Sequence, residues 1–219
     1  MIALIRYTFA TVLHTQRYVA PLLLFTGLMG VLTVNGTGPL PAAYASSAGA
    51  MFVCSTWLAV AVTSLDEPPQ RAITIVTAGG RPLRVLLAAI GTVLLSCLAL
   101  MAVGLLLPLW LGDHAVTAAD LLLGTEAQLA CALTGTAIGV FCSRQVFTRQ
   151  GYAVIAAVAL LSGALFTKGL PPVNRLFTLM ATTPDAVPLL VPAGAMTALS
   201  ALLLTASAAA AHFAGGHRQ

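Results

Sequence analysis

The stretch from Leu83 to Leu111 reads LRVLLAAIGTVLLSCLALMAVGLLLPLWL and carries a single charge, Arg84, close to its start. A helix needs about 20 predominantly apolar residues to cross the hydrocarbon core of a bilayer. This stretch exceeds that length, and it lacks the alternation of apolar and polar residues that marks the strands of a membrane barrel. It therefore predicts a membrane-spanning helix and an all-α fold.

The rest of the chain has the same apolar character. Hydrophobic residues make up 59% of its 219 residues, charged residues only 7%, and the mean hydropathy is +0.97. Because a soluble domain carries about 25% charged residues, this chain cannot cover a water-facing surface. The net charge of +4 does not indicate a nucleic-acid partner, since the arginines are spread over short loops. We predict an integral membrane protein whose surroundings are the lipid bilayer.

Six apolar stretches are predicted to span the membrane, and together they form a single transmembrane domain over residues 1–219. They are Val19–Val34, Ala43–Leu65, Leu83–Leu111, Leu121–Cys142, Tyr152–Thr167 and Ala186–His212. Six spans place both termini on one side, together with all the arginines except Arg175. Only Lys168 and Arg175 then lie on the other side. Since basic residues favour the cytoplasmic loops, the arginine-rich side and both termini are predicted to be cytoplasmic.

The first residues of the chain form an amphipathic pattern. Ile2, Ile5, Phe9, Val12 and Leu13 recur at helical spacing, and Arg6, Ala10, His14 and Arg17 occupy an opposing face. This pattern over residues 1–17 predicts an interfacial helix on the inner leaflet. An ordinary extension of the first span is the alternative.

A short polar segment, residues 66–82, separates the second and third spans. Two acids and two prolines open it, Gly79-Gly80 end it, and the intervening helix from Pro69 to Ala78 would be only about 15 Å long. Ala72, Ile73 and Val76 share one face and would be buried against another protein. We expect a cytoplasmic coupling contact here, through which a partner protein acts on this chain. The residues expected to form it are Glu67, Pro69, Arg71, Ala72, Ile73 and Val76. A helix that only floats at the interface is the alternative.

A second unusual segment, residues 168–186, connects the fifth and sixth spans on the outer side. Pro171-Pro172 end the fifth helix, and apolar residues at 173, 176, 177 and 180 predict one short amphipathic helix. Such a half-apolar helix is expected to dip into the outer leaflet, where protein or water can satisfy its backbone.

Residues suited to catalysis or metal binding are scarce. The chain lacks a Gly-x-x-x-x-Gly-Lys phosphate loop, and no nucleophile, base and acid can be combined within the spans. Cys54, Cys97, Cys131 and Cys142 lie in or beside apolar stretches without metal-type spacing, so we expect them to be small buried hydrophobic residues. We predict a protein that is not an enzyme and holds neither metal nor cofactor of its own.

Glu126 is the clearest acid inside a predicted span. A carboxylate in the middle of a membrane helix usually faces a protein interior or an aqueous path, but a later helix start would place Glu126 at the interface. The candidates for lining a substrate path are Phe52, Trp57, Glu126, Gln128 and Phe166.

Together these parts resemble an ABC-2 type transporter permease. The resemblance covers nearly the whole chain, and its most specific stretch is Asp66–Arg84, which is similar to the coupling region of small actinobacterial permeases. Arginine far outnumbers lysine and alanine is abundant, as in a bacterium with a GC-rich genome. The resemblance implies a bacterial plasma membrane, a separate ABC ATPase subunit that binds ATP and Mg, and a second permease copy or a homologous permease.

The resemblance also implies export of a hydrophobic or amphipathic substrate, such as a drug, natural product, peptide or lipid-like compound. Small residues that would let two copies approach closely are Ala130, Gly135 and Gly139 in the fourth span and Gly151, Ala156 and Gly163 in the fifth. Two alternatives stay open. One is a membrane-embedded immunity or interaction protein without a transport cycle, and the other is a haem-exporter-like permease, for which His114 gives weak support.

Overall fold

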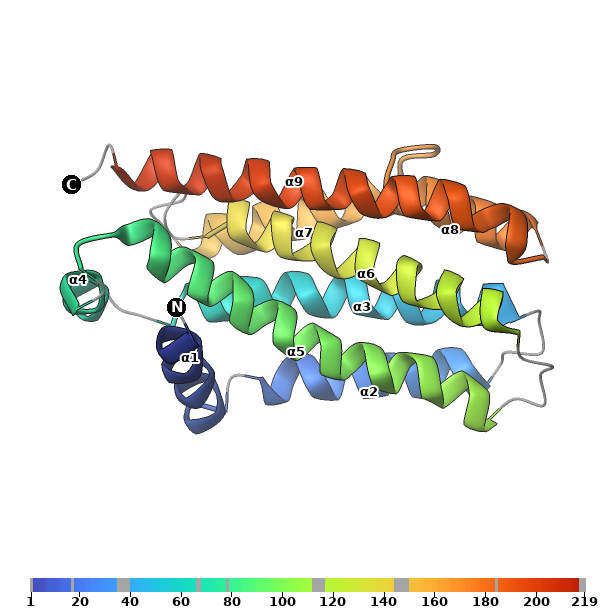
Figure 1. The fold of residues 1–219 in the computed structure, drawn as a ribbon, viewed down its shortest axis with the longest axis horizontal. Coiled ribbons are helices and arrows are strands. Elements are labelled where there is room, and N and C mark those ends of the chain that lie inside the picture. The colour runs from blue at the N-terminus through green and yellow to red at the C-terminus, as the bar shows by residue number, and fades with distance from the viewer. Residues whose placement is uncertain are drawn as a thin grey trace.

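The computed structural model describes residues 2–16, 18–34, 40–65, 68–77, 79–111, 117–143, 150–183 and 185–216, and all regular structure in these ranges is helical (Figure 1). The all-α prediction is confirmed for this part of the chain. The elements are α1 (Ile2–His14), α2 (Val19–Val34), α3 (Leu40–Thr63), α4 (Pro68–Thr77), α5 (Pro82–Leu111), α6 (Ala118–Phe141), α7 (Gln150–Phe166), α8 (Val173–Thr182), the 3-10 turn η1 (Val187–Leu189) and α9 (Leu190–Gly216).

Four of the described helices are long and apolar enough to cross a membrane. They are Leu40–Thr63, Pro82–Trp110, Ala118–Phe141 and Val187–Ala214, with 24 to 29 residues each. Lengths of about 36–44 Å exceed the roughly 30 Å of a bilayer core. By length and composition this is therefore a membrane protein. α2 and α7, which the sequence also predicted as spans, have 16 and 17 residues and measure only about 24–26 Å.

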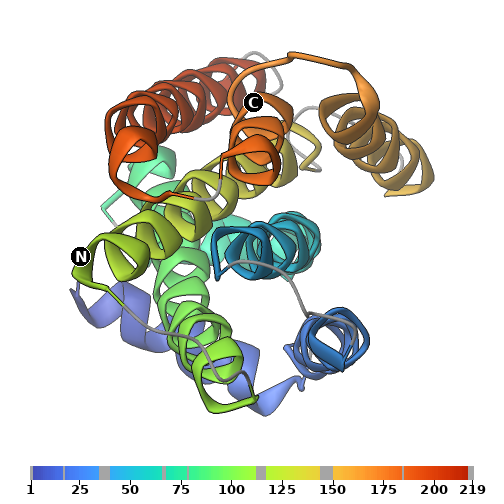
Figure 2. The ribbon, with the colours of Figure 1, turned by 90° about the vertical axis from the view of Figure 1, so that its right-hand side faces the viewer.

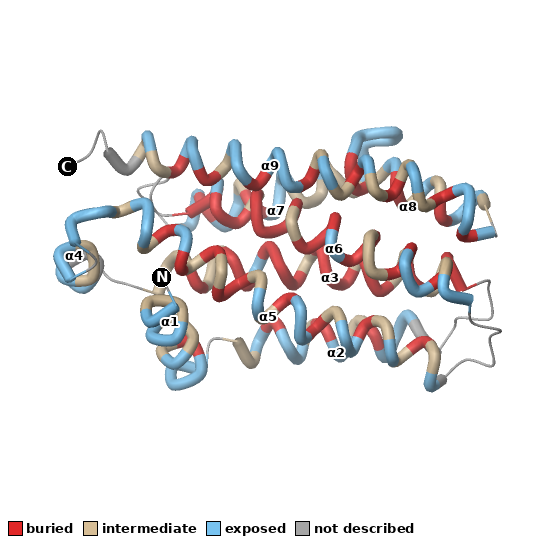
Figure 3. Tube along the Cα trace, in the orientation of Figure 1, coloured by how far each residue is buried: buried red, intermediate tan, exposed pale blue. Residues whose placement is uncertain are grey.

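α6 lies between α3 and α9 in the interior of the bundle, and Figure 3 shows buried residues concentrated along α3 and α6. Close contact with α3 depends on two glycines of α6. A Cβ on Gly135 would lie 2.7 Å from the Phe52 carbonyl oxygen, and one on Gly139 would lie 2.8 Å from that of Thr56. Small residues are what allow membrane helices to approach this closely.

Hydrogen bonds join α6 to its neighbours as well. Ser55 Oγ in α3 donates to the Cys131 carbonyl oxygen at 3.5 Å, and Thr134 Oγ1 donates to Ser200 Oγ in α9 at 2.9 Å. Such bonds between membrane helices contribute about 0.6 kcal/mol each. α3, α6 and α9 therefore form a slab fixed by both shape and polar contacts.

The start of α6 is defined by a capping box. The Thr117 main-chain N–H donates to Asp120 Oδ2 at 3.0 Å, and the Asp120 N–H donates to Thr117 Oγ1 at 3.3 Å. Such reciprocal bonds satisfy two main-chain donors that the first helical turn leaves open. α6 therefore does not start late, and Glu126 lies in its third turn.

α1 and α4 lie at the same end of the bundle, whereas α8 lies toward the opposite end (Figure 1). α1 crosses α5, and the Ile5 side chain lies 3.3 Å from where a Cβ on Gly91 would be. Of the predicted apolar stripe of α1, Val12 is buried, whereas Ile2 and Leu13 are exposed. α5 therefore covers the apolar face of α1 only in part, and the remaining apolar side chains of that face are exposed.

Candidate functional site

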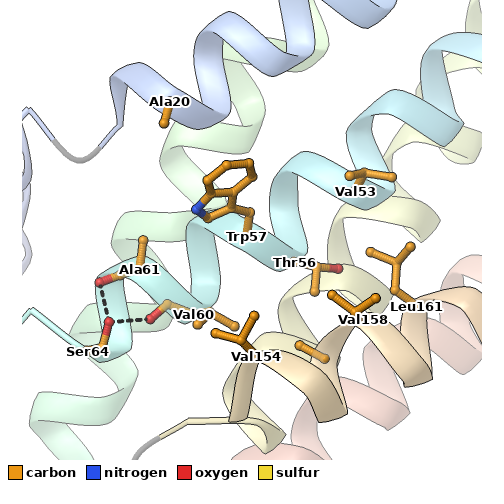
Figure 4. A pocket seen from close by; sticks show the side chains of 11 residues that line it. Ala20, Val53, Thr56, Trp57, Val60, Ala61, Ser64, Val154, Val158 and Leu161 are labelled. Carbon is orange, nitrogen blue, oxygen red and sulfur yellow. Dashed lines mark hydrogen bonds between the residues drawn. The ribbon is translucent and has the colours of Figure 1, made fainter. Parts of the chain in front are cut away.

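A groove of about 750 Å³ lies between α3 and α7, with α2 at one edge (Figure 4). Its lining residues are Ala20, Val53, Thr56, Trp57, Val60, Ala61, Ser64, Val154, Ala157, Val158 and Leu161. The groove exists because α7 stands apart from the slab. Among the described side chains of α7, only Ala153 and Ala157 are buried.

The groove is almost wholly apolar, and none of its lining residues carries a charge. Both of its hydroxyls donate to the preceding turn of α3, Thr56 Oγ1 to the Phe52 carbonyl oxygen and Ser64 Oγ to that of Val60, each at 2.8 Å. Trp57 is 48% exposed and points toward Ala20 of α2 (Figure 4). Its indole adds a large apolar surface with one N–H donor. This lining suits an apolar or amphipathic solute.

The predicted path residues do not come together. Trp57 alone lines the groove. Phe52 is fully buried in the core, and Phe166 is 82% exposed at the end of α7. Glu126 and Gln128 lie on different sides of α6, because two residues along a helix differ by about 200° in direction.

Gln128 is held between α3 and α5. Its Nε2 donates to Ser47 Oγ at 3.1 Å, and a Cβ on Gly104 would lie 2.8 Å from its Oε1. Oε1 is enclosed and has no hydrogen-bond partner among the described residues. The Gln128 side chain therefore links α6 to α3. It fits there because residue 104 is a glycine, whose lack of a Cβ leaves room for the amide.

Glu126 faces α9. Its Oε1 lies 3.7 Å from where a Cβ on Gly194 would be, and Thr197 Oγ1 donates to the Glu126 main-chain oxygen at 3.2 Å. The second carboxyl oxygen, Oε2, is enclosed without a hydrogen-bond partner in the described ranges. This carboxyl group therefore belongs to the α6–α9 contact and not to the groove.

The groove lining contributed by α7 was not predicted. Val154, Ala157, Val158 and Leu161 recur at helical spacing. However, α7 is apolar on all sides, so its sequence gives no sign of which face meets α3.

α4 is a separate candidate site at the end of the bundle. Ile73 is 65% exposed and Val76 74% exposed, on one face of the helix. α4 ends in a Schellman motif, since the Gly80 N–H donates to the Ile75 carbonyl oxygen at 2.9 Å and the Gly79 N–H to that of Val76 at 3.1 Å. Gly79 and Gly80 have φ of +79° and +70°, which glycine adopts without strain.

The other predicted coupling residues can be placed only in part. Glu67 lies outside the described residues. Pro69, Arg71 and Ala72 belong to α4, but their side chains lie outside the described part of the structure. The predicted coupling face is therefore seen through Ile73 and Val76.

Residues 168–186 contain the short amphipathic helix predicted from their spacing. α8 buries Val173, Leu176 and Met180. Asn174 ties α8 to the end of α7, because its Oδ1 accepts from the Gly169 N–H at 2.9 Å and its Nδ2 donates to the Leu165 carbonyl oxygen. This pair of bonds satisfies a main-chain carbonyl that the end of α7 would leave open.

Cys54, Cys97, Cys131 and Cys142 are all free and buried, as expected of small hydrophobic residues. Within the described ranges, no group of three or more His, Cys, Asp or Glu side chains could hold a metal ion. His114 lies outside those ranges.

These observations define a helical membrane protein with an apolar groove and an exposed amphipathic helix. No family model matches the chain, and neither a curated protein nor a solved structure is significantly similar to it. The functional argument therefore depends on the chain's own residues and geometry.

Proposed function

We propose that this chain is the permease subunit of an ATP-driven ABC exporter of the ABC-2 type, in a bacterial plasma membrane. The exposed apolar face of α4 is the observation that carries the proposal. A helix of ten residues is too short to span a bilayer, and its described packing against other helices is slight, with α5 as its neighbour. Its Ile73 and Val76 therefore need another surface, and we assign that surface to a cleft on the ATPase.

The energetics favour a protein cleft over water. Fully burying one large aliphatic side chain contributes about 1.5–3 kcal/mol, so Ile73 and Val76 together could anchor the helix. The Schellman motif at Gly79 and Gly80 fixes where α4 ends and where α5 begins. Movement of the ATPase would then reach α5 through a short, well-defined connection.

The proposal includes six spans with both termini in the cytoplasm. α2 and α7 run beside the long helices in Figure 2, and spans of about 24–26 Å can be accommodated by local thinning of the bilayer. In this topology α1 lies on the inner leaflet and α8 forms a re-entrant element in the outer leaflet. No described feature specifically supports the haem-exporter or the immunity-protein alternative.

The groove between α3 and α7 gives the proposal a substrate path. Its uncharged lining supports an apolar or amphipathic cargo. Because the groove opens at the surface of the helix bundle, a second permease copy or a homologous permease would have to cover it. ATP and Mg would bind to the ATPase partner and not to this chain.

The test uses the full chain expressed with the ABC ATPase that this proposal predicts to be encoded beside its gene. Ile73→Asp should abolish co-purification of the ATPase and substrate-stimulated ATP hydrolysis, because it places an unpaired charge in the proposed contact. Thr74→Asp introduces the same charge on another face of α4 and should leave both intact. Normal assembly and export by Ile73→Asp would overturn the proposal.

A further inference from the structure

A second apolar recess lies on the exposed side of α6. α5 and α9 meet over α6 near α1 and α4, where Leu86, Ile90 and Leu204 belong to one buried cluster. The two helices diverge toward the other end of the bundle (Figure 1). α6 is therefore covered at one end and open between α5 and α9 along the rest.

The open part contains a cavity of about 180 Å³ between α5 and α6. Leu98 and Met101 form one wall, and Leu129 and Leu133 form the other. Every lining side chain is apolar or a thiol, so this recess suits hydrocarbon. It shares no residue with the groove between α3 and α7.

Glu126 does not line this recess, but it lies on the same face of α6 as two residues that do. It precedes Leu129 by three residues and Leu133 by seven, a spacing that keeps all three side chains on neighbouring positions of one helix face. Glu126 is half-buried, and its enclosed Oε2 has no hydrogen-bond partner among the described residues. The absent side chain of Gly194 leaves room for the carboxyl group on the α9 side.

Among the described residues no basic side chain forms an ion pair with Glu126, including Arg175 of α8, a helix that also packs on α6. The basic residues of α5, α6 and α9 are Arg84 and His212, which lie at the ends of α5 and α9 nearest α4. The other acid of α6, Asp120, is engaged in the capping box with Thr117. An unpaired carboxylate inside a membrane is costly, so a cationic partner would stabilise it.

We propose that the α5–α6 recess and Glu126 form a binding site for a membrane-partitioned long-chain amine. The alkyl chain lies against Leu98, Met101, Leu129 and Leu133, and the ammonium group donates to the carboxylate of Glu126. A fatty acid or an alkyl sulfate would bring a second negative charge beside Glu126 and is excluded by charge. A fatty alcohol shares the hydrocarbon contact but lacks the ion pair.

The experiment uses the full-length chain in phosphatidylcholine nanodiscs with two photoreactive probes. Both carry the same 12-carbon chain with a diazirine, and one ends in a primary amine whereas the other ends in a hydroxyl group. The amine probe should label α5 and α6 peptides around the recess about tenfold more than the alcohol, because a charge-assisted hydrogen bond is lost with the alcohol. Unlabelled dodecylamine should compete.

Two variants separate the ion pair from the hydrocarbon contact. Glu126→Gln should lower amine labelling to the level of the alcohol, while the neighbouring Thr125→Gln should leave it unchanged. Leu133→Trp should lower labelling by both probes, because the indole fills the recess. Equal labelling of the unsubstituted protein by amine and alcohol would overturn the proposal, and this comparison decides even where a variant fails to fold. Full amine labelling of a folded Glu126→Gln protein would overturn it too.

Discussion

α6 and α7 were predicted as spans by the same hydropathy rule, yet they are held in very different ways. Fourteen residues of α6 are buried, including Gly135 and Gly139 against α3. In α7, a Cβ on Gly151 or Gly163 would point into open space, with no atom of another described element within 4 Å. Small residues in a predicted span therefore have no single role. In α6 they allow close contact with another helix of the same chain, and in α7 they leave the helix surface uncovered.

The comparison corrects one expectation of the sequence. Ala130, Gly135 and Gly139 were predicted to help two copies approach, but all three are buried inside the bundle. Of the six small residues proposed for that contact, only those of α7 keep accessible surface: Gly151 and Gly163 are exposed, and Ala156 is half-buried. Any contact between copies through these spans would have to use α7.

The largest expected effect comes from a bulky side chain at Gly139. Gly139→Leu should destabilise the protein by about 3 kcal/mol or more, because main-chain atoms of α3 cannot yield as side chains can. Gly163→Leu is the matched variant in α7 and should change stability by less than about 1 kcal/mol. Unfolding in mixed micelles measures both. Equal losses would show that α7 is packed as tightly as α6.

A smaller loss is expected at Gln128. Gln128→Ala should cost about 2–3 kcal/mol, because it leaves a cavity between α3, α5 and α6 and removes the bond to Ser47. Leu161→Ala in α7 should cost less than about 1 kcal/mol, since Leu161 lines the open groove. The same unfolding assay applies, and a costlier Leu161→Ala would contradict the picture of a loosely held α7.

Asn174→Ala should cost about 1–2 kcal/mol, because it removes two hydrogen bonds that fix α8 to the end of α7. The loss should be local. Hydrogen exchange should speed up around residues 165–175 and remain slow in α6. Faster exchange throughout α6 would show that the two regions unfold together.

The smallest effect concerns the bond between α6 and α9. A double-mutant cycle with Thr134→Val and Ser200→Ala should give a coupling energy of about 0.6 kcal/mol, and not above about 1.7 kcal/mol. A coupling near zero would mean that shape alone holds α6 to α9.

Helix positions could be predicted from sequence because apolar composition and helix-ending residues are local signals. α2 has the predicted bounds, Val19–Val34, and α4 starts and ends one residue before its predicted bounds. Helix faces could not be predicted in the same way. α3, α6 and α7 carry apolar residues on most sides, so the pattern does not say that Gln128 faces α3 while Glu126 faces α9.

The candidate site likewise contains residues that could be predicted from sequence and others that could not. Ile73 and Val76 could be predicted as an exposed apolar pair because α4 is surrounded by polar residues, which makes its amphipathic pattern clear. Trp57 is the one path residue that lies in the groove, and it was chosen without knowledge of α7 as its neighbour. Pairing of distant helices depends on contacts between residues far apart in the chain, which a single sequence does not reveal.

The central place of α6 has a consequence for biosynthesis. Ser55 forms its bond with Cys131 across 76 residues of chain, which a ribosome adds in roughly 4–15 s at about 5–20 residues per second. During that interval α3 presents Ser47, Ser55 and Thr56 without the partner that covers them. A nascent chain stopped before α6 would therefore be a natural target for membrane quality-control proteases, and a chaperone that shields α3 would raise the yield of the mature protein.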